Sequence, residues 1–297
     1  MFPVVDVSRW SIAKPESAGG DEKYWLRSPA DERWLYKPRT EHDGWVQGED
    51  WAEKISTEVA NVLGVPAATV ELAVRDGRHG TISRSLRPAD WELQHGAVML
   101  GRVVSDYTVK SGDRRGHTLA NIELALALDG GVGVPRGWSG PPELSAFDVL
   151  AGYLMLDALV ANQDRHEENW AVLRPLPGEG PTVLAGSYDH ASSLGFNLQD
   201  QRRTLYLERG LTAWAVKARA QRFERATDGQ LGLVELAHAA LRRGSDGARV
   251  HWHHALACCH RGTWEQIIQC VPDMSDPKRS FVMALLEINH GRLLHEF

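Results

Sequence analysis

The stretch Asn162-Gln163-Asp164-Arg165-His166-Glu167-Glu168-Asn169-Trp170 is the most informative part of this sequence. It directly follows the most apolar run of the chain, residues 147–161, and precedes the short apolar run Ala171-Val172-Leu173. An apolar run of that length predicts a buried helix, and the second run predicts a strand. The polar segment between them is therefore predicted to be a loop at the mouth of a lobe.

Asp164 and Asn169 have four residues between them, which is the spacing found in the catalytic loops of kinases. In such loops the Asp accepts the proton of the attacking hydroxyl and the Asn coordinates Mg²⁺. An ionised Asp can orient a hydroxyl, and Asn offers a metal a neutral, hard oxygen. Asp164 is thus the candidate catalytic base and Asn169 a candidate metal ligand. Both residue types also cap ordinary loops, which is the alternative.

A second carboxylate follows the predicted hairpin of Val172-Leu173 and Val183-Leu184, in the segment Ser187-Tyr188-Asp189-His190. Kinases place a metal-binding Asp after such a hairpin, although their Asp-Phe-Gly motif is absent here. Asp189 is therefore the second candidate metal ligand.

Lys37 ends the predicted strand Trp34–Tyr36, from which a lysine can reach the phosphates of a nucleotide. Such a lysine needs a carboxylate partner from the following helix, predicted over residues 49–63. Glu49 and Glu53 are one turn apart there, and Glu53, nearer the centre of the helix, is the preferred partner. A solvated surface position is the alternative for both Lys37 and Glu53.

A loop of small residues precedes these elements, Ser17-Ala18-Gly19-Gly20-Asp21-Glu22-Lys23. Small residues let backbone N–H groups approach phosphate oxygens closely, so this segment is a candidate phosphate-binding loop. It is neither a Walker motif nor a G-x-G-x-x-G motif.

Composition and charge argue against several classes of protein. The chain has 297 residues and a net charge of −6, from 33 Lys and Arg against 39 Asp and Glu, so we expect no nucleic-acid partner. The apolar run 147–161 contains Asp148 and Asp157 and is too short to span a membrane, so we expect no membrane partner. Three cysteines and no signal peptide predict a cytoplasmic protein.

Strand signals dominate the first part of the chain and helix signals the remainder. The strands are predicted at Tyr24–Leu26, Trp34–Tyr36, Thr69–Arg75 and Gly80–Ser85, and the later helices at Leu119–Leu128, Ser145–Ala161 and from about Leu211 onward. The sequence therefore predicts an α+β fold with a small β-rich nucleotide-binding lobe, residues 1–105, and a larger, mainly helical catalytic lobe, residues 106–297. A cleft between two lobes favours ligand binding.

Taken together, these motifs resemble the HipA-type serine/threonine kinases. The resemblance rests on Asn162–Asn169, which is similar to the family's Asn-x-Asp-x-His-x-x-Asn, and on Tyr188-Asp189-His190-Ala191-Ser192-Ser193. Ser17–Lys23, Lys37-Pro38 and Glu53 with Val59–Gly64 also match, so the similarity spans roughly residues 15–195. It implies a bilobal protein-kinase-like fold and ATP- and Mg²⁺-dependent phosphorylation of a Ser or Thr hydroxyl of a protein or peptide.

The resemblance also implies roles for single residues. Asp164 would be the catalytic base, and Asn169 and Asp189 would hold Mg²⁺. The remaining residues would bind ATP: Ala18, Gly19, Gly20, Lys23, Lys37, Glu53, His166 and Tyr188. Arg84-Ser85-Leu86 is a loose match to the adenine hinge. The family's extra N-terminal subdomain, which contacts an antitoxin, has no counterpart in the matched region, so an antitoxin partner is not carried over.

Other functions remain open. The same hydroxyl chemistry would serve a small-molecule kinase acting on an antibiotic or a sugar. A nucleotide-binding pseudokinase scaffold is the third possibility, although the polar residues of the reaction are all present. The histidines and cysteines of residues 251–260 allow a zinc hypothesis, but no second paired motif accompanies them and we favour helix packing.

Overall fold

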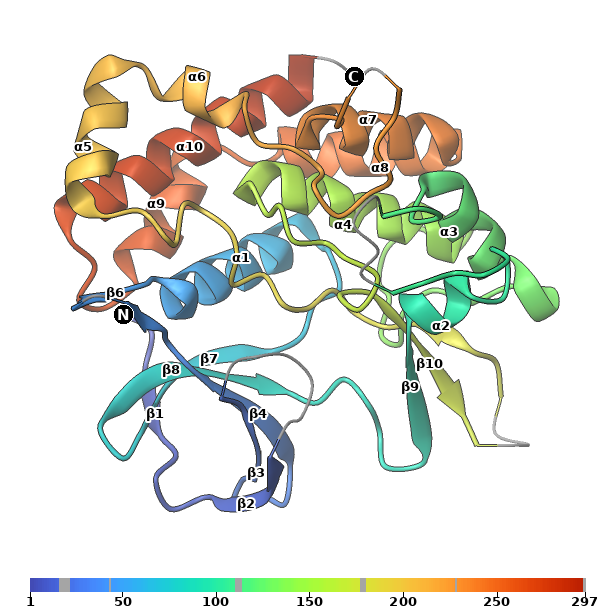
Figure 1. Cartoon of the computed structure of the whole chain (residues 1–297), viewed down its shortest axis with the longest axis horizontal. Helices are drawn as coiled ribbons and strands as arrows, with labels where there is room; N and C mark the ends of the chain where they lie inside the picture. Colours follow the sequence, from blue (N-terminus) through green and yellow to red (C-terminus); the bar gives the residue numbers. More distant parts are fainter. Residues whose placement is uncertain (16–21, 43, 110–113, 177–179, 228, 296–297) are drawn as a thin grey trace.

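The first third of the chain forms a six-stranded sheet with the order β1-β7-β8-β4-β3-β2 (Figure 1). The computed structural model describes residues 1–15, 22–42, 44–109, 114–176, 180–227 and 229–295. The strands are β1 (Val4–Asp6), β2 (Ser11–Pro15), β3 (Tyr24–Arg27), β4 (Arg33–Pro38), β7 (Val70–Arg75) and β8 (Arg78–Arg84). A separate two-stranded sheet of β5 (Glu41–His42) and β6 (Trp45–Val46) follows β4 in the sequence.

The predicted hairpin of β3 and β4 is confirmed, with Tyr24 opposite Tyr36. Residues of β4 alternate between two faces. Trp34 and Tyr36 are buried in a small apolar core of the sheet, whereas Arg33, Leu35 and Lys37 face a cleft on the other side. The alternation therefore sends Lys37 out of the core and into the cleft.

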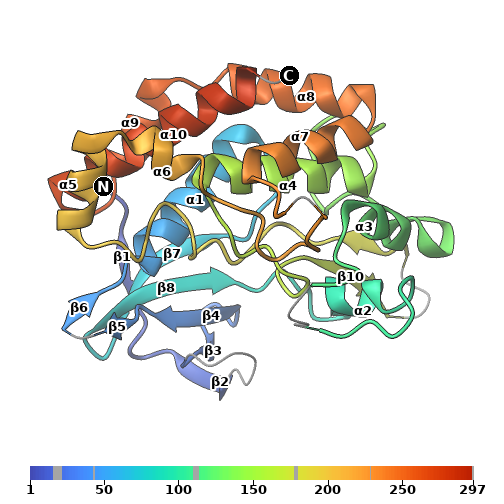
Figure 2. The ribbon, with the colours of Figure 1, turned by 45° about the horizontal axis from the view of Figure 1, so that its top comes forward.

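Helix α1 (Glu49–Leu63) has the bounds that the sequence predicted. Its apolar residues Trp51, Ile55 and Val59 are buried, and Gly64 ends it in the left-handed conformation at φ 70°. Val62, expected on the buried face, is 47% exposed. Figures 1 and 2 show α1 between the sheet and the other helices, and it contacts β7, β8 and α4. Because α1 touches both lobes, it fixes their relative position.

A second sheet was not fully predicted. The expected hairpin of β10 (Ala171–Pro175) and β11 (Val183–Leu184) is confirmed, but β10 also pairs along its length with β9 (Trp91–His95). The run of residues 96–105 begins with a short helix, α2 (Gly96–Leu100). Since β9 pairs with β10 and not with the six-stranded sheet, we propose the connection 85–90 as the boundary between the lobes, in place of residue 105.

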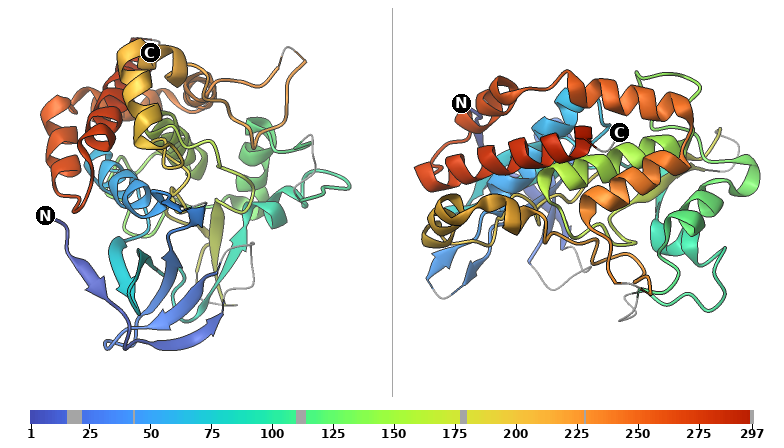
Figure 3. Two further views of the ribbon diagram at one scale, coloured as in Figure 1. Left: turned by 60° about the vertical axis from the view of Figure 1, so that its left-hand side comes forward. Right: turned by 90° about the horizontal axis from the view of Figure 1, so that it is seen from above.

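The rest of the chain is mainly helical. Its helices are α3 (Leu119–Leu126), the 3₁₀ turn Leu128–Gly130, α4 (Ala146–Val160), α5 (Asp200–Arg209), α6 (Leu211–Ala215), α7 (Leu233–Arg243), α8 (Asp246–Ala257), α9 (Arg261–Gln269) and α10 (Asp276–His295). Every residue of α4 is buried. It packs against α7 and α10, and Figure 3 shows these helices side by side. A helix buried on all sides gives the helical lobe its centre.

Two expectations for this lobe were incomplete. Helix α5 was not predicted, because its residues are mostly polar. The continuous helical region expected from Leu211 is interrupted, since the described residues between α6 and α7 form turns and isolated bridges.

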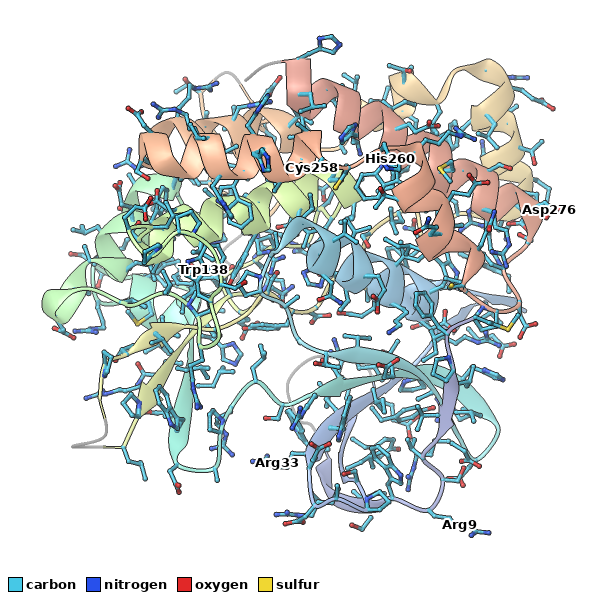
Figure 4. All side chains as sticks on the ribbon, turned by 180° about the vertical axis from the view of Figure 1, so that it is seen from behind. Arg9, Arg33, Trp138, Cys258, His260 and Asp276 are labelled. Atoms are coloured by element: carbon cyan, nitrogen blue, oxygen red, sulfur yellow. The ribbon has the colours of Figure 1, made fainter. Side chains whose placement is uncertain are left out.

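Cys258 is exposed near the junction of α8 and α9, where Figure 4 labels it beside His260. Among the residues that the structure describes, no group of three or more His, Cys, Asp or Glu could hold a metal ion. No helix in the described ranges is long and apolar enough to cross a membrane.

Gly152 lies where α4 meets α8, and a methyl group there would approach the ring of Trp252 to 2.3 Å. We expect Gly152→Ala to lower the free energy of unfolding by about 1–3 kcal/mol, because the ring and both helices must shift. Gly291 of α10 is the control, since a Cβ there meets nothing within 4 Å. Gly291→Ala should be stabilising by up to about 1 kcal/mol. Urea denaturation of both variants measures this, and equal stabilities would contradict the close approach.

Candidate active site

The loop that follows α4 is fastened by one buried arginine. Arg165 forms a two-pronged ion pair with Asp157, with Nε–Oδ2 and Nη2–Oδ1 distances of 2.7 and 2.8 Å. Its Nη1 donates to the carbonyl of Asn169 at 2.5 Å and its Nη2 to the hydroxyl of Ser187 at 2.9 Å. The side chains of Arg165 and Asp157 are 5% and 1% exposed. Arg165 therefore joins the end of α4, the loop and the segment that carries Asp189.

Within the loop, a hydrogen bond from the side chain of Asn169 to the backbone of Asp164 holds the two residues together. The Nδ2 of Asn169 donates to the carbonyl of Asp164 at 2.8 Å, and the amide of Asp164 donates to the side chain of Asn162 at 3.1 Å. Because the nitrogen of the Asn169 amide is used in this way, its oxygen is the end left for a metal ion. The Asp164 carboxylate meets Arg222, with an Oδ1–Nε distance of 2.5 Å.

Lys37 lies between two carboxylates. Its Nζ is 2.7 Å from Oδ1 of Asp189 and 3.9 Å from Oε2 of Glu53. Burial raises the pKa of both carboxyl groups, but the Lys37 ammonium together with the hydrogen bonds and the other charges around them outweighs it, so both pKa values are lowered and both groups are ionised at neutral pH. Asp189 has a φ of 60°, a conformation that Asp adopts more readily than most residues. This strained backbone aims its carboxylate at Lys37.

Glu53, and not Glu49, is the helix carboxylate beside Lys37. It is 2% exposed, and its Oε1 accepts a hydrogen bond of 2.9 Å from the amide of His190. The His190 ring in turn bonds to the Ser187 hydroxyl at 2.7 Å. Glu49 instead accepts from the amide of Thr40 at 3.1 Å. Glu53 therefore links α1 to the segment 187–190 across the two lobes.

A cleft of about 340 Å³ lies between the lobes. Six of the predicted site residues line it, namely Lys23, Lys37, His166, Asn169, Tyr188 and Asp189. Residues 84–86, the loosely matched hinge, also line it, where β8 leads toward β9. Glu53 is buried beside Lys37, and Asp164 faces Arg222. Ala18, Gly19 and Gly20 lie outside the described residues.

Two of the ring residues that line the cleft, Tyr188 and His166, are uncharged at neutral pH. The Tyr188 hydroxyl donates to the carbonyl of Glu168 at 2.8 Å, and burial raises its pKa. Burial also lowers the pKa of His166, in spite of the carboxylates of Asp164 and Asp189 nearby. These two rings therefore add no positive charge to that of Lys23 and Lys37 in the cleft.

Sequence reasoning missed two residues of the site. Arg222 lies far from Asp164 in the chain, and nothing in its neighbours indicates the contact. Arg165 lies inside the segment 162–170, between Asp164 and His166, but no role was predicted for it. Its place in that motif was the only feature of the sequence that could have pointed to it.

The donor set can be tested against a divalent metal ion. An Asn amide oxygen and an Asp carboxylate are hard oxygen donors, which suit Mg²⁺. Magnesium usually keeps several waters and binds one or two protein groups together with phosphates. Asn169 and Asp189, which both line the cleft, fit that pattern, and phosphate oxygens and water would complete the set.

The fold is of a known class, an α+β bilobal protein-kinase-like fold. The chain is similar to the Helicobacter pylori proinflammatory kinase CtkA, with a TM-score of 0.76 at 16% identity over 99% of this chain and 96% of that one. It is also similar to HipA of Shewanella oneidensis MR-1, solved with HipB and operator DNA, with a TM-score of 0.53 at 14% identity over 96% of this chain and 66% of that one. No family model and no curated protein matches the sequence.

At the level of the fold, these structural similarities agree with the resemblance to the HipA-type kinases. Identities of 16% and 14% show the fold alone, so membership of the HipA-type family is not shown.

The charges around Lys37 predict a pH-dependent mutant phenotype. In the wild type the pKa of Asp189 in the folded state lies below its value of 3.8 in the unfolded chain. The stability that the ionised Asp189 contributes is therefore constant above pH 3.8 and is lost as the pH falls through the folded-state pKa. In Lys37→Met the largest influence that lowers the pKa of Asp189 and Glu53 is lost while burial remains, so both pKa values rise. Their ionisation then destabilises the fold at neutral pH but not in mild acid.

The measurement is the free energy of unfolding of wild type and Lys37→Met at about pH 7.5 and about pH 5. We expect the loss caused by the substitution to be larger at the higher pH. Lys217 is the control, because it is exposed and Lys217→Met should give the same small change at both values. A Lys37→Met penalty independent of pH would contradict the buried charge balance.

Proposed function

We propose that this chain is a phosphotransferase that uses ATP and Mg²⁺ to phosphorylate a Ser or Thr hydroxyl of a protein or peptide. The observation that carries the proposal is the half-buried Lys37–Asp189 ion pair of 2.7 Å, which lies beside the buried Glu53 and in the same cleft as Asn169. A lysine on a strand, a helix glutamate and two oxygen donors around one cleft are the parts of a kinase site. A serine/threonine kinase of HipA-like type is the finer form of this proposal.

The nucleotide phosphates would be held at the Lys37 end of the cleft. The Lys37 ammonium would contact them, with Lys23 adding a second positive charge. The adenine would lie farther in, toward residues 84–86, where Leu35 and Leu86 supply apolar walls. When bound, Mg²⁺ would neutralise developing phosphate charge, and Asn169 and Asp189 would hold it.

Asp164 would orient the acceptor hydroxyl and accept its proton as the oxygen attacks the γ-phosphate. The loop contacts of Arg165 and Asn169 fix the backbone of Asp164, so most of the catalytic effect would come from positioning and electrostatic stabilisation. Every polar group that the reaction requires is present, which favours an active enzyme over a pseudokinase scaffold. We expect the protein to act in the cytoplasm.

Asp164→Asn should retain ATP binding and lose phosphoryl transfer by about 10²–10⁴-fold. The Asn side chain has the same shape and the backbone bonds survive, but it cannot accept the hydroxyl proton. ATP affinity is measured by isothermal titration calorimetry, and transfer by radiolabel on any acceptor, including the protein itself. Asp129→Asn is the control, since Asp129 forms a surface ion pair with Arg102. Transfer by Asp164→Asn at nearly the wild-type rate would show that Asp164 is not the base.

Asn169→Ala and Asp189→Asn should each raise the Mg²⁺ concentration needed for half-maximal ATP binding by about tenfold or more. The reason is that each removes one hard oxygen donor from the cleft wall. His254→Ala, on the exposed part of α8, should leave the Mg²⁺ dependence unchanged. The metal assignment is wrong if a zinc chelator abolishes transfer while Mg²⁺ remains in excess.

A further inference from the structure

A basic segment lies against the proposed catalytic loop. Residues 217–225, Lys-Ala-Arg-Ala-Gln-Arg-Phe-Glu-Arg, carry four basic side chains and one acidic side chain, in a chain whose net charge is −6. The amide of Arg219 donates to Oε1 of Gln163 at 3.1 Å, and Nε of Arg222 donates to Oδ1 of Asp164 at 2.5 Å. An acceptor hydroxyl that reaches Asp164 must therefore approach beside this segment.

The backbone of the segment is held at Arg222 by His117. The Nδ1 of His117 donates to the carbonyl of Arg222 at 2.6 Å, and its Nε2 accepts from Nε1 of Trp170 at 3.3 Å. The ring also stacks on Phe223, with centroids 4.4 Å apart. Burial lowers the pKa of His117 to about 4, so the ring is neutral at physiological pH. Only the neutral ring can donate at one nitrogen and accept at the other.

Further contacts hold the rest of the segment. The carboxylate of Glu224 accepts from the amide of Gly116 at 2.6 Å, and the amide of Glu224 donates to the carbonyl of His117 at 3.0 Å. Nε2 of Gln230 donates to the carbonyl of Phe223 at 2.8 Å. The carboxylate of Glu224, the one acidic residue of the segment, thus binds a backbone amide. Among the contacts of the described residues it forms no ion pair with the neighbouring arginines. The segment keeps its positive charge.

The guanidinium of Arg222 has donors to spare. Its Nε is used by Asp164, and no described residue accepts from its two Nη groups. The side chain is 37% exposed, and that of Asp164 is 29% exposed. A guanidinium that is fixed at one edge and open at the other binds carboxylate or phosphate groups through that open edge.

We propose that residues 217–225 form the acceptor-binding edge of the site and that Arg222 makes the acceptor an acidic peptide, with Glu, Asp or phosphoserine near the target Ser or Thr. This inference rests on the proposed function and adds the substrate class. Carboxylates of the acceptor would bind the open edge of Arg222, with Lys217 and Arg225 steering them, while the hydroxyl meets Asp164. Arg222 is then a specificity-determining residue.

The experiment compares three serine peptides of equal length whose flanks are acidic, neutral or basic. We expect the wild type to show kcat/KM for the acidic peptide about tenfold above that for the neutral one, since a hydrogen bond between charged groups is worth about that factor. The preference should shrink as salt rises. Arg222→Ala should bring the ratio of the two values close to one. Arg222→Lys, which keeps the charge, should restore part of it.

Two controls separate this inference from the proposed function. Arg202→Ala, on the exposed face of α5, should leave the ratio unchanged. Binding of fluorescent acidic and neutral peptides, measured by anisotropy with a non-hydrolysable ATP analogue present, tests the surface without turnover. Transfer without an acidic preference, or a preference that survives Arg222→Ala, would overturn the inference alone. If no peptide is phosphorylated but acidic peptides bind through Arg222, the surface stands and the proposed function fails. Equal binding of both peptides would overturn the inference.

Discussion

The buried pair of Arg165 and Asp157 is the interaction on which the site depends. Asp157 belongs to the last turns of α4, the one helix that is buried along its whole length. From that fixed point Arg165 reaches the carbonyl of Asn169, the hydroxyl of Ser187 and, at 3.3 Å, the carbonyl of Tyr188. Removing one partner of such a pair costs about 3–5 kcal/mol, because the other charge stays buried and unpaired. One side chain therefore sets the spacing between the loop of Asp164, the proposed base, and the segment of Asp189, a proposed metal ligand.

A second constraint acts across the two lobes. Lys37 belongs to the six-stranded sheet, Glu53 to α1, and Asp189 to the segment after β11, so the three charges bring together parts of the chain that share no secondary structure. Glu53 is buried and the other two side chains are half-buried, so each charge is stabilised by the presence of the others. The contact between the two lobes and the proposed chemistry of the cleft thus rest on the same ion pairs.

The sequence predicted the helices, strands and site residues that are indicated by residues close together in the chain. Helix α1 was predicted at its observed bounds because its apolar residues repeat every three or four positions and Gly64 follows it. Strand β9 was missed because Trp91-Glu92-Leu93-Gln94-His95 becomes a strand only by pairing with β10, which lies far along the chain. Asp164, Asn169 and Asp189 could be proposed as site residues because their residue types and spacing are typical of kinase chemistry. Arg222 was not, since its contact with Asp164 depends on tertiary structure alone.

The segment that holds Arg222 shows how that tertiary structure is imposed. Its residues have no strong tendency against a helix, yet it runs as turns between α6 and α7. The hydrogen bonds that fix it come from Gln163, Gly116 and the neutral ring of His117, which itself rests on Trp170 of the catalytic loop. The loop 162–170 therefore positions the same segment that borders Asp164, the proposed base. Irregular backbone held by a rigid scaffold is where recognition commonly resides, and here α4 supports the loop of the proposed base and, through it, the proposed acceptor edge.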